Sequence, residues 1–216
     1  MFRRALCIAV MLTLSGGVLA QTKKKPNTKP AKGAGRVVTA TRQAAAMKDA
    51  AEMFVGRWRT EEKFEKNEMM PNGGSGHGAA TNVLGAGDLY IVSDYHSVQT
   101  PSGKFSGHGV MWYDPNANGY RAVWCDSMSQ FGCDDMGLGK WDEQHANLVF
   151  EGDSEMMGQK YHFRNTYTDL DQRSFTFVME AGPSADQMQK IGTIKYTRVG
   201  SIPRNLAPKN NPKVKE

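Results

Sequence analysis

Five histidines supply the side chains best suited to binding a metal or transferring protons: His77, His96, His108, His145 and His162. No two have the four-residue separation that places both on one helix face, or another short spacing that local structure would bring to one metal. His77, His96 and His108 fall on three successive predicted strands and would come together only if the strand registers aligned them. We therefore expect surface or hydrogen-bonded histidines and no metal site.

Two further groups contain residue types that enzymes use. One is a set of acids near a predicted turn, and the other has the side chains of a hydrolytic triad: Asp126, Asp134 and Asp135, and Asp94, His96 and Ser127. Their spacing does not place a nucleophile beside a base, and the chain has no Gly-x-Ser-x-Gly segment or phosphate-binding glycine loop. The sequence therefore predicts no catalytic residues and favours a non-enzymatic protein.

The first 20 residues have the pattern of a secretory signal peptide, with Arg3 and Arg4, then an apolar run, then small residues ending at Ala20. The apolar run is shorter than the roughly 20 residues that span a bilayer. We therefore expect cleavage after Ala20 and no transmembrane segment. The mature protein is expected to be exported, to the periplasm or the extracellular space.

Two segments rich in lysine and proline, residues 21–41 and 201–216, flank the body of the chain, and both are expected to be disordered. They hold ten of the 27 basic residues, and two more lie in the signal peptide, which leaves 15 against 21 acids between residues 37 and 200. The folded body is therefore net acidic and lacks the basic face that nucleic-acid binding needs. We expect no nucleic-acid partner, although the basic tails could contact an anionic envelope surface weakly.

Cys125 and Cys133 are the cysteines of the expected mature chain. If the residues around Met128 to Gln130 form a hairpin turn, residues equally far from position 129 face each other across the two strands. Cys125 and Cys133 are each four residues from that position. A cross-strand disulfide is then geometrically reasonable, and export favours it chemically. Two free thiols, or a redox or metal role, stay open as alternatives, although the CxxC spacing is absent.

Residues 42–200 have the pattern of one helix followed by many short strands. Apolar residues at three- and four-residue spacing predict an amphipathic helix from Arg42 to Phe54, ended at Gly56. About ten strands are predicted, at residues 56–65, 77–84, 89–98, 104–113, 119–127, 131–141, 146–152, 160–169, 173–180 and 190–199. Turn-forming residues separate them, and the regular spacing predicts an antiparallel meander.

Trp58 in the first predicted strand and Arg198 in the last indicate how the sheet closes. If these strands pair, the arginine can lie over the indole, which contributes about 0.5 to 2 kcal/mol, and no edge is left exposed. The expected fold is all-β, an antiparallel up-and-down barrel of about ten strands with the N-terminal helix covering a barrel end. A two-sheet sandwich is the alternative. Gly107 and Gly109, on one strand face, fit a sharp bend or the close approach of another group.

Gly56-x-Trp58 with Arg198 resembles the signature of the calycin group, which includes lipocalins and fatty-acid-binding proteins. Three longer segments resemble the bacterial domain of unknown function 1579 family (DUF1579), itself lipocalin-like: Phe105-x-Gly107-x-Gly109-x-x-Trp112-Tyr113-Asp114, Gly119-Tyr120-x-x-x-Trp124-x-Asp126-Ser127-Met128 and Ile194-x-Tyr196-Thr197-Arg198. The resemblance spans about Met47 to Val199. It implies a lipocalin-like, calycin-type barrel with structural roles for Gly56, Trp58 and Arg198.

Apolar side chains on the predicted strands alternate with a few polar ones, as ligand pockets require. We therefore expect the barrel to bind a small apolar or amphipathic molecule, with no cofactor. The candidate ligand-binding residues are Tyr95, Met111, Trp124, Asp126, Phe163, Arg164 and Phe177.

Two alternative functions stay open. One is a haem- or metal-binding barrel or an enzyme: a related barrel type binds haem through one histidine, so the resemblance makes His108 or His162 the candidate axial ligand. The other is a solid, ligand-free barrel that serves as an envelope interaction module.

Overall fold

The computed structural model of the chain describes residues 34–67, 70–100, 103–129, 132–156 and 159–201. The predicted signal peptide, most of the predicted linker and the predicted tail from residue 202 onward lie outside these ranges. Within them, no helix combines the length and the apolar character needed to cross a membrane.

The helix α1 extends from Ala34 to Phe54. It begins before the predicted Arg42 and includes residues 34–41 of the predicted linker. The last proline before the helix is Pro30, and a helix that is already nucleated extends at little cost through residues that lack proline. The sequence therefore allowed a longer helix than its apolar spacing indicated.

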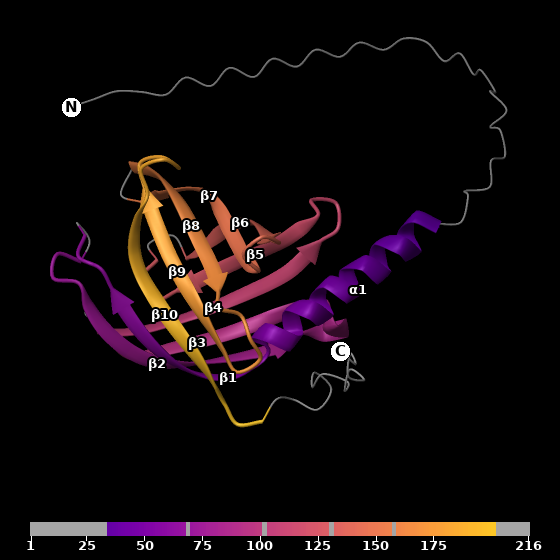
Figure 1. Cartoon of the computed structure of the whole chain (residues 1–216), viewed down its shortest axis with the longest axis horizontal. Helices are drawn as coiled ribbons and strands as arrows, with labels where there is room; N and C mark the ends of the chain where they lie inside the picture. Colours follow the sequence, from indigo (N-terminus) through magenta and orange to yellow (C-terminus); the bar gives the residue numbers. More distant parts are fainter. Residues whose placement is uncertain (1–33, 68–69, 101–102, 130–131, 157–158, 202–216) are drawn as a thin grey trace, which may run out of the picture. The chain divides into compact units, whose positions relative to one another are not determined.

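The second half of α1 covers one end of the barrel, as predicted (Figure 1). Met47, Ala50 and Ala51 are fully buried. The helix is tied to the strands by polar contacts as well, because the Tyr120 hydroxyl donates to the carbonyl of Ala46 at 2.9 Å. This helix makes one end of the barrel a closed end.

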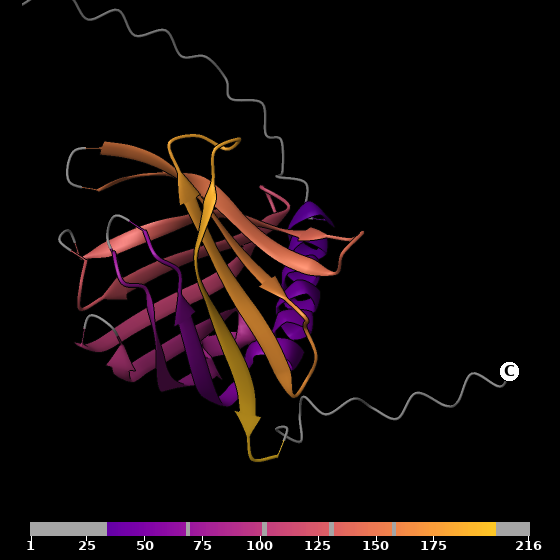
Figure 2. The ribbon, with the colours of Figure 1, turned by 60° about the vertical axis from the view of Figure 1, so that its left-hand side comes forward.

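Ten antiparallel strands follow in the described part of the chain. They are β1 (Gly56–Phe64), β2 (Gly74–Leu84), β3 (Tyr90–Thr100), β4 (Gly103–Asp114), β5 (Gly119–Asp126), β6 (Cys133–Asp142), β7 (Asn147–Met156), β8 (Gln159–Thr168), β9 (Ser174–Gly182) and β10 (Gln189–Val199), with a short 3-10 turn η1 (Ala86–Asp88) before β3. Each strand pairs with its neighbours in sequence, and β1 also pairs with β10, which closes the barrel (Figure 2). The predicted up-and-down barrel is confirmed, and the sandwich alternative is wrong.

The strands β1 and β10 meet at Trp58 and Arg198, which are register partners. The guanidinium carbon of Arg198 lies 4.1 Å from the centroid of the Trp58 ring. The predicted stacking is therefore confirmed. The Trp58 indole is 1% exposed, so this contact takes place in the core.

Arg198 also binds the end of α1. Its guanidinium donates to the main-chain carbonyls of Val55 and Met53, and its Nε donates to the carbonyl of Gln172. A cation suits this position because the last carbonyls of a helix carry partial negative charge. Gly56 makes room for it: the residue has φ +149°, and a Cβ there would lie 2.0 Å from Nη1 of Arg198.

Alternate residues of each strand point into the barrel. In β1, Trp58, Thr60 and Glu62 are buried, and the residues between them are exposed. Because strand side chains alternate with period two, one inward residue identifies all the others on a regular strand. The same alternation decides which side chains can contact a molecule inside the barrel.

A disulfide joins Cys125 of β5 to Cys133 of β6. The two residues are register partners, as the hairpin numbering predicted, so the predicted disulfide is confirmed. Farther from the hairpin, a register shift between Arg121 and Val123 changes the pairing.

Replacing Arg198 with methionine should lower the free energy of unfolding by about 2 kcal/mol or more, because buried carbonyls lose charge-assisted hydrogen bonds. Chemical denaturation measures this change. Arg57→Met is the matched control, since Arg57 is an exposed residue of the same strand. Equal stabilities of the two variants would contradict the role given to Arg198.

Replacing both cysteines with serine should lower the free energy of unfolding by about 2 to 3 kcal/mol, because the disulfide restricts the unfolded chain. Denaturation of the wild type with and without reductant should show the same difference. The double variant serves as the control, because reductant should leave its stability unchanged. A wild type insensitive to reductant, with its thiols shown to be free, would contradict the prediction.

Candidate functional site

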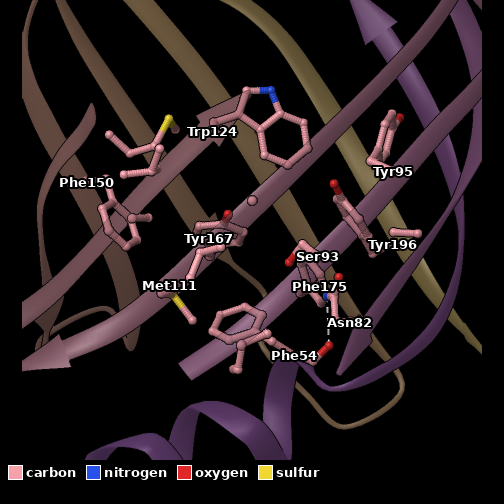
Figure 3. Close-up of a pocket in the computed structure, with 17 residues that line it drawn as sticks. Phe54, Asn82, Ser93, Tyr95, Met111, Trp124, Phe150, Tyr167, Phe175 and Tyr196 are labelled. Atoms are coloured by element: carbon pink, nitrogen blue, oxygen red, sulfur yellow. Dashed lines mark hydrogen bonds between the residues drawn. The ribbon is translucent and has the colours of Figure 1, made fainter. Parts of the chain in front are cut away.

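A cavity of about 80 Å³ lies inside the barrel (Figure 3). Its aromatic lining comes from the end of α1 and from six strands: Phe54, Tyr95, Trp124, Phe150, Tyr167, Phe175 and Tyr196. Ala80, Ile91, Met111, Ala122 and Met136 add aliphatic surface. The side chains of Asn82 and Ser93 add polar groups. None of these described lining residues is charged.

The aromatic rings pack on one another toward the closed end. Phe175 stacks on Tyr196 at a centroid distance of 4.2 Å and meets Trp58 edge to face at 4.8 Å. The ring centroid of Phe54 lies 5.3 Å from that of Phe175 and 5.0 Å from that of Tyr167. Such ring contacts add to the free energy gained by burying apolar area, so this wall of the cavity is held in place by the same residues that close the barrel.

Trp124 lies over two glycines of the neighbouring strand. A Cβ on Gly107 would be 2.3 Å from Cζ2 of the indole, and one on Gly109 would be 2.8 Å from Cε3. The indole Nε1 donates to the carboxylate of Asp126 at 3.0 Å. The sequence predicted either a bend or the close approach of another group at these glycines. The structure shows a close approach, by the Trp124 indole, so the glycines set its position.

Asn82 carries a polar atom without a partner among the described residues. The residue is 7% exposed, and its Nδ2 donates to the carbonyl of Phe54 at 2.9 Å. Its Oδ1 has no hydrogen-bond partner. A buried acceptor without a donor costs about 1 to 3 kcal/mol, which makes this atom a feature that needs an explanation.

Two tyrosine hydroxyls also border the cavity. In Figure 3, the hydroxyls of Tyr167 and Tyr196 point toward the space between the lining side chains, and within the described part of the chain neither has a hydrogen-bond partner. Burial raises the pKa of Tyr167 to about 12, and burial also raises the pKa of Tyr196 well above its usual value. Both side chains are therefore neutral hydroxyls at physiological pH.

Next to the cavity, Glu62 forms a buried hydrogen-bonded group with hydroxyl side chains. It is 4% exposed; its carboxylate accepts from the hydroxyl of Tyr95 and from Ser97 Oγ, the latter at 3.1 Å. The Thr60 hydroxyl lies 3.3 Å from that of Tyr95. Burial, followed by the bond to Glu62, raises the pKa of Tyr95. The carboxylate is tolerated inside the barrel because hydroxyls replace the lost water.

The predicted ligand-binding residues divide between the cavity and other places. Tyr95, Met111 and Trp124 line the cavity. Asp126 is outside the lining but accepts the hydrogen bond from Trp124. The two predicted phenylalanines do not line it either: Phe163 is buried and Phe177 packs against the core.

The interpretation of Arg164 as an interior anchor is wrong. Its guanidinium donates to Glu151 at 2.8 Å. Arg164 is adjacent to Phe163, which faces the core, and neighbours on a strand point to opposite faces. Arg164 therefore lies on the outer face of the barrel, so it and Phe163 cannot share an interior role.

The candidate haem ligands also lie on the outer face. His108 pairs with Asp94 and has a side chain 67% exposed. The imidazole of His162 contacts Asp153 and Glu151 at 2.7 and 2.9 Å, and these contacts raise its pKa, Asp153 more than Glu151. Neither histidine lines the cavity, so neither is placed to ligate a group bound inside it.

The residues with candidate enzyme chemistry are separated in the same way. Asp94 pairs with His108, His96 is exposed, and Ser127 Oγ accepts from the backbone N–H of Ser106. They form no triad. Within the described ranges, no three histidine, cysteine or acidic side chains are grouped as metal ligands would be.

Sequence reasoning missed the polar residues Glu62, Asn82 and Tyr167. A signal was present for Glu62, because Trp58 faces inward and residues at even spacing from it in β1 must do the same. For Asn82 no such signal existed, since its position next to the end of α1 depends on the packing of distant segments.

Comparison with known proteins gives a family and a set of barrel structures. A family model described as "Protein of unknown function (DUF1579)" matches residues 43–198. No curated protein matches the sequence. Among solved structures, a de novo designed fluorescence-activating β-barrel has 14% identity and a TM-score of 0.39, over 70% of this chain and 98% of that one. The S-type phycobiliprotein lyase CPES from Guillardia theta has 9% identity and a TM-score of 0.46, over 78% and 99%.

Replacing Gly107 with alanine should displace the Trp124 indole, because the added methyl group overlaps it. We expect a change in the near-ultraviolet circular dichroism and a loss of about 1 to 3 kcal/mol in the free energy of unfolding. The control is His108→Ala, which alters the outer face of the same strand. An unchanged Trp124 environment in Gly107→Ala would contradict the packing described.

Proposed function

The chain belongs to the DUF1579 family of proteins of unknown function, and we propose that it binds a small apolar or amphipathic molecule in the cavity of its barrel. The observation that carries the proposal is a space inside the barrel with aromatic walls, bordered by the unpaired Oδ1 of Asn82 and by two tyrosine hydroxyls without a partner among the described residues. Apolar walls with few polar groups are typical of small-molecule sites.

The size of the cavity limits the bound molecule. An engineered apolar cavity of about 150 Å³ binds benzene, and the space inside this barrel is about 80 Å³. A single ring therefore requires the lining side chains to move apart on binding. A whole long acyl chain does not fit.

The charges inside the barrel favour a neutral molecule over an anion. Tyr95, which lines the cavity, is hydrogen-bonded to the buried Glu62. The guanidinium of Arg198 is already occupied by three main-chain carbonyls and the Trp58 ring. An anion entering the cavity would therefore face a carboxylate and gain no free cation from Arg198.

We also propose that the protein works outside the cytoplasm. The signal-peptide pattern of residues 1–20 supports this location. The disulfide between Cys125 and Cys133 is consistent with it, because disulfides persist mainly in oxidising compartments.

Filling the cavity should abolish binding. Phenol, a single ring with seven non-hydrogen atoms, is a suitable probe, and its affinity can be measured by calorimetry or ligand-detected NMR. In Ala80→Phe the new side chain occupies the cavity that Ala80 lines, so we expect the affinity to fall at least about tenfold.

The neighbouring residue provides the matched control. Ala79 is exposed on the outer face of β2, so Ala79→Phe adds the same side chain outside the barrel and should leave the affinity unchanged. Circular dichroism checks that both variants fold. Absence of phenol binding to the wild type, or equal binding to the two folded variants, would contradict the proposal.

A further inference from the structure

We infer that Asn82 is the specificity residue of this site, and that the bound molecule is a small ring compound whose neutral polar group donates a hydrogen bond to Asn82 Oδ1. The inference rests on the proposed function and adds the chemical class of the ligand. It predicts that the site binds a ring with a hydroxyl group more tightly than a hydrocarbon of the same shape or a carboxylate.

The orientation of the Asn82 amide is set by the end of α1. Nδ2 donates to the carbonyl of Phe54 at 2.9 Å. Rotating the amide by half a turn would bring Oδ1 against that carbonyl, and two acceptors repel each other. The same carbonyl also accepts from Nε1 of Trp58 at 2.9 Å, so it stays fixed. Oδ1 is therefore an obligate acceptor on a residue that lines the cavity.

A donor from the protein does not reach this acceptor. Asn82 is 7% exposed, it lines the cavity, and its buried Oδ1 has no partner among the described residues. Buried acceptors are normally satisfied. A donor on a bound molecule would satisfy this one, and a hydrocarbon of the same size would leave it unpaired.

Two tyrosine hydroxyls without partners further restrict the chemical class of the bound molecule. Tyr167 and Tyr196 line the cavity and have no hydrogen-bond partner among the described residues. Each hydroxyl can donate its proton as well as accept one. A ligand hydroxyl donates to Asn82 and has lone pairs left for a tyrosine, whereas an ammonium group has no lone pair and a carboxylate has no proton to donate.

Phenol and toluene test the inference, because they have the same shape and differ only in hydroxyl against methyl. Calorimetry gives both dissociation constants for the wild type and for Asn82→Leu. Leucine has nearly the shape of asparagine, and Phe54 keeps the hydrogen bond from Trp58. We expect the substitution to weaken phenol binding about tenfold or more and to leave toluene binding nearly unchanged.

The matched control is Asn165→Leu. Asn165 is a register partner of Phe150 on an interior position of β8 but does not line the cavity. This variant should keep the wild-type ratio of the two dissociation constants. If Asn82→Leu keeps that ratio as well, the role of Asn82 is overturned, while the proposed function stands.

A second measurement needs no substitution. In the wild type, the side-chain carbonyl carbon resonance of Asn82 should shift on saturation with phenol and remain in place with toluene. Equal shifts with the two compounds would overturn the inference. If neither compound binds the wild type, the proposed function itself fails, and this outcome is distinct from binding without discrimination.

Discussion

The contact between Trp58 and Arg198 is the constraint on which the rest of the structure depends. It joins the first strand to the last, and the same guanidinium holds the carbonyls at the end of α1. One cation therefore lies at the junction where β1 and β10 close the sheet, and it attaches the helix to that junction. The contact requires a residue without a side chain at Gly56, which accounts for the Gly-x-Trp spacing in physical terms.

This closed end determines where a cavity can exist. Phe54, Trp58 and Phe175 fill the interior next to the helix, and the helix carbonyl of Phe54 fixes the orientation of the Asn82 amide. Farther along β1, Glu62 and its hydroxyl partners form a polar group next to the cavity. The interior thus carries polar groups at two places among its aromatic side chains, Asn82 beside the end of the helix and Glu62 farther along β1.

Much of the fold could be predicted because its signals are local. Period-two alternation and turn residues predicted ten strands within a few residues of their bounds, and hairpin numbering predicted the pairing of Cys125 with Cys133. The site was predicted less well. Tyr95, Met111 and Trp124 line the cavity, but Arg164 was assigned to the interior although it follows the inward Phe163. Strict use of alternation would have excluded it and would have included Glu62.

The sequence by itself determined the strand order, the positions of the turns and the alternation of inward and outward residues, because these depend on contacts between neighbours along the chain or across one hairpin. Only the tertiary structure decided which side chains meet across the barrel. Segments far apart in sequence determine three features: the unpaired oxygen of Asn82, the packing of Trp124 on Gly107 and the volume of the cavity. No local pattern encodes them, because each is what remains after many distant side chains have packed together.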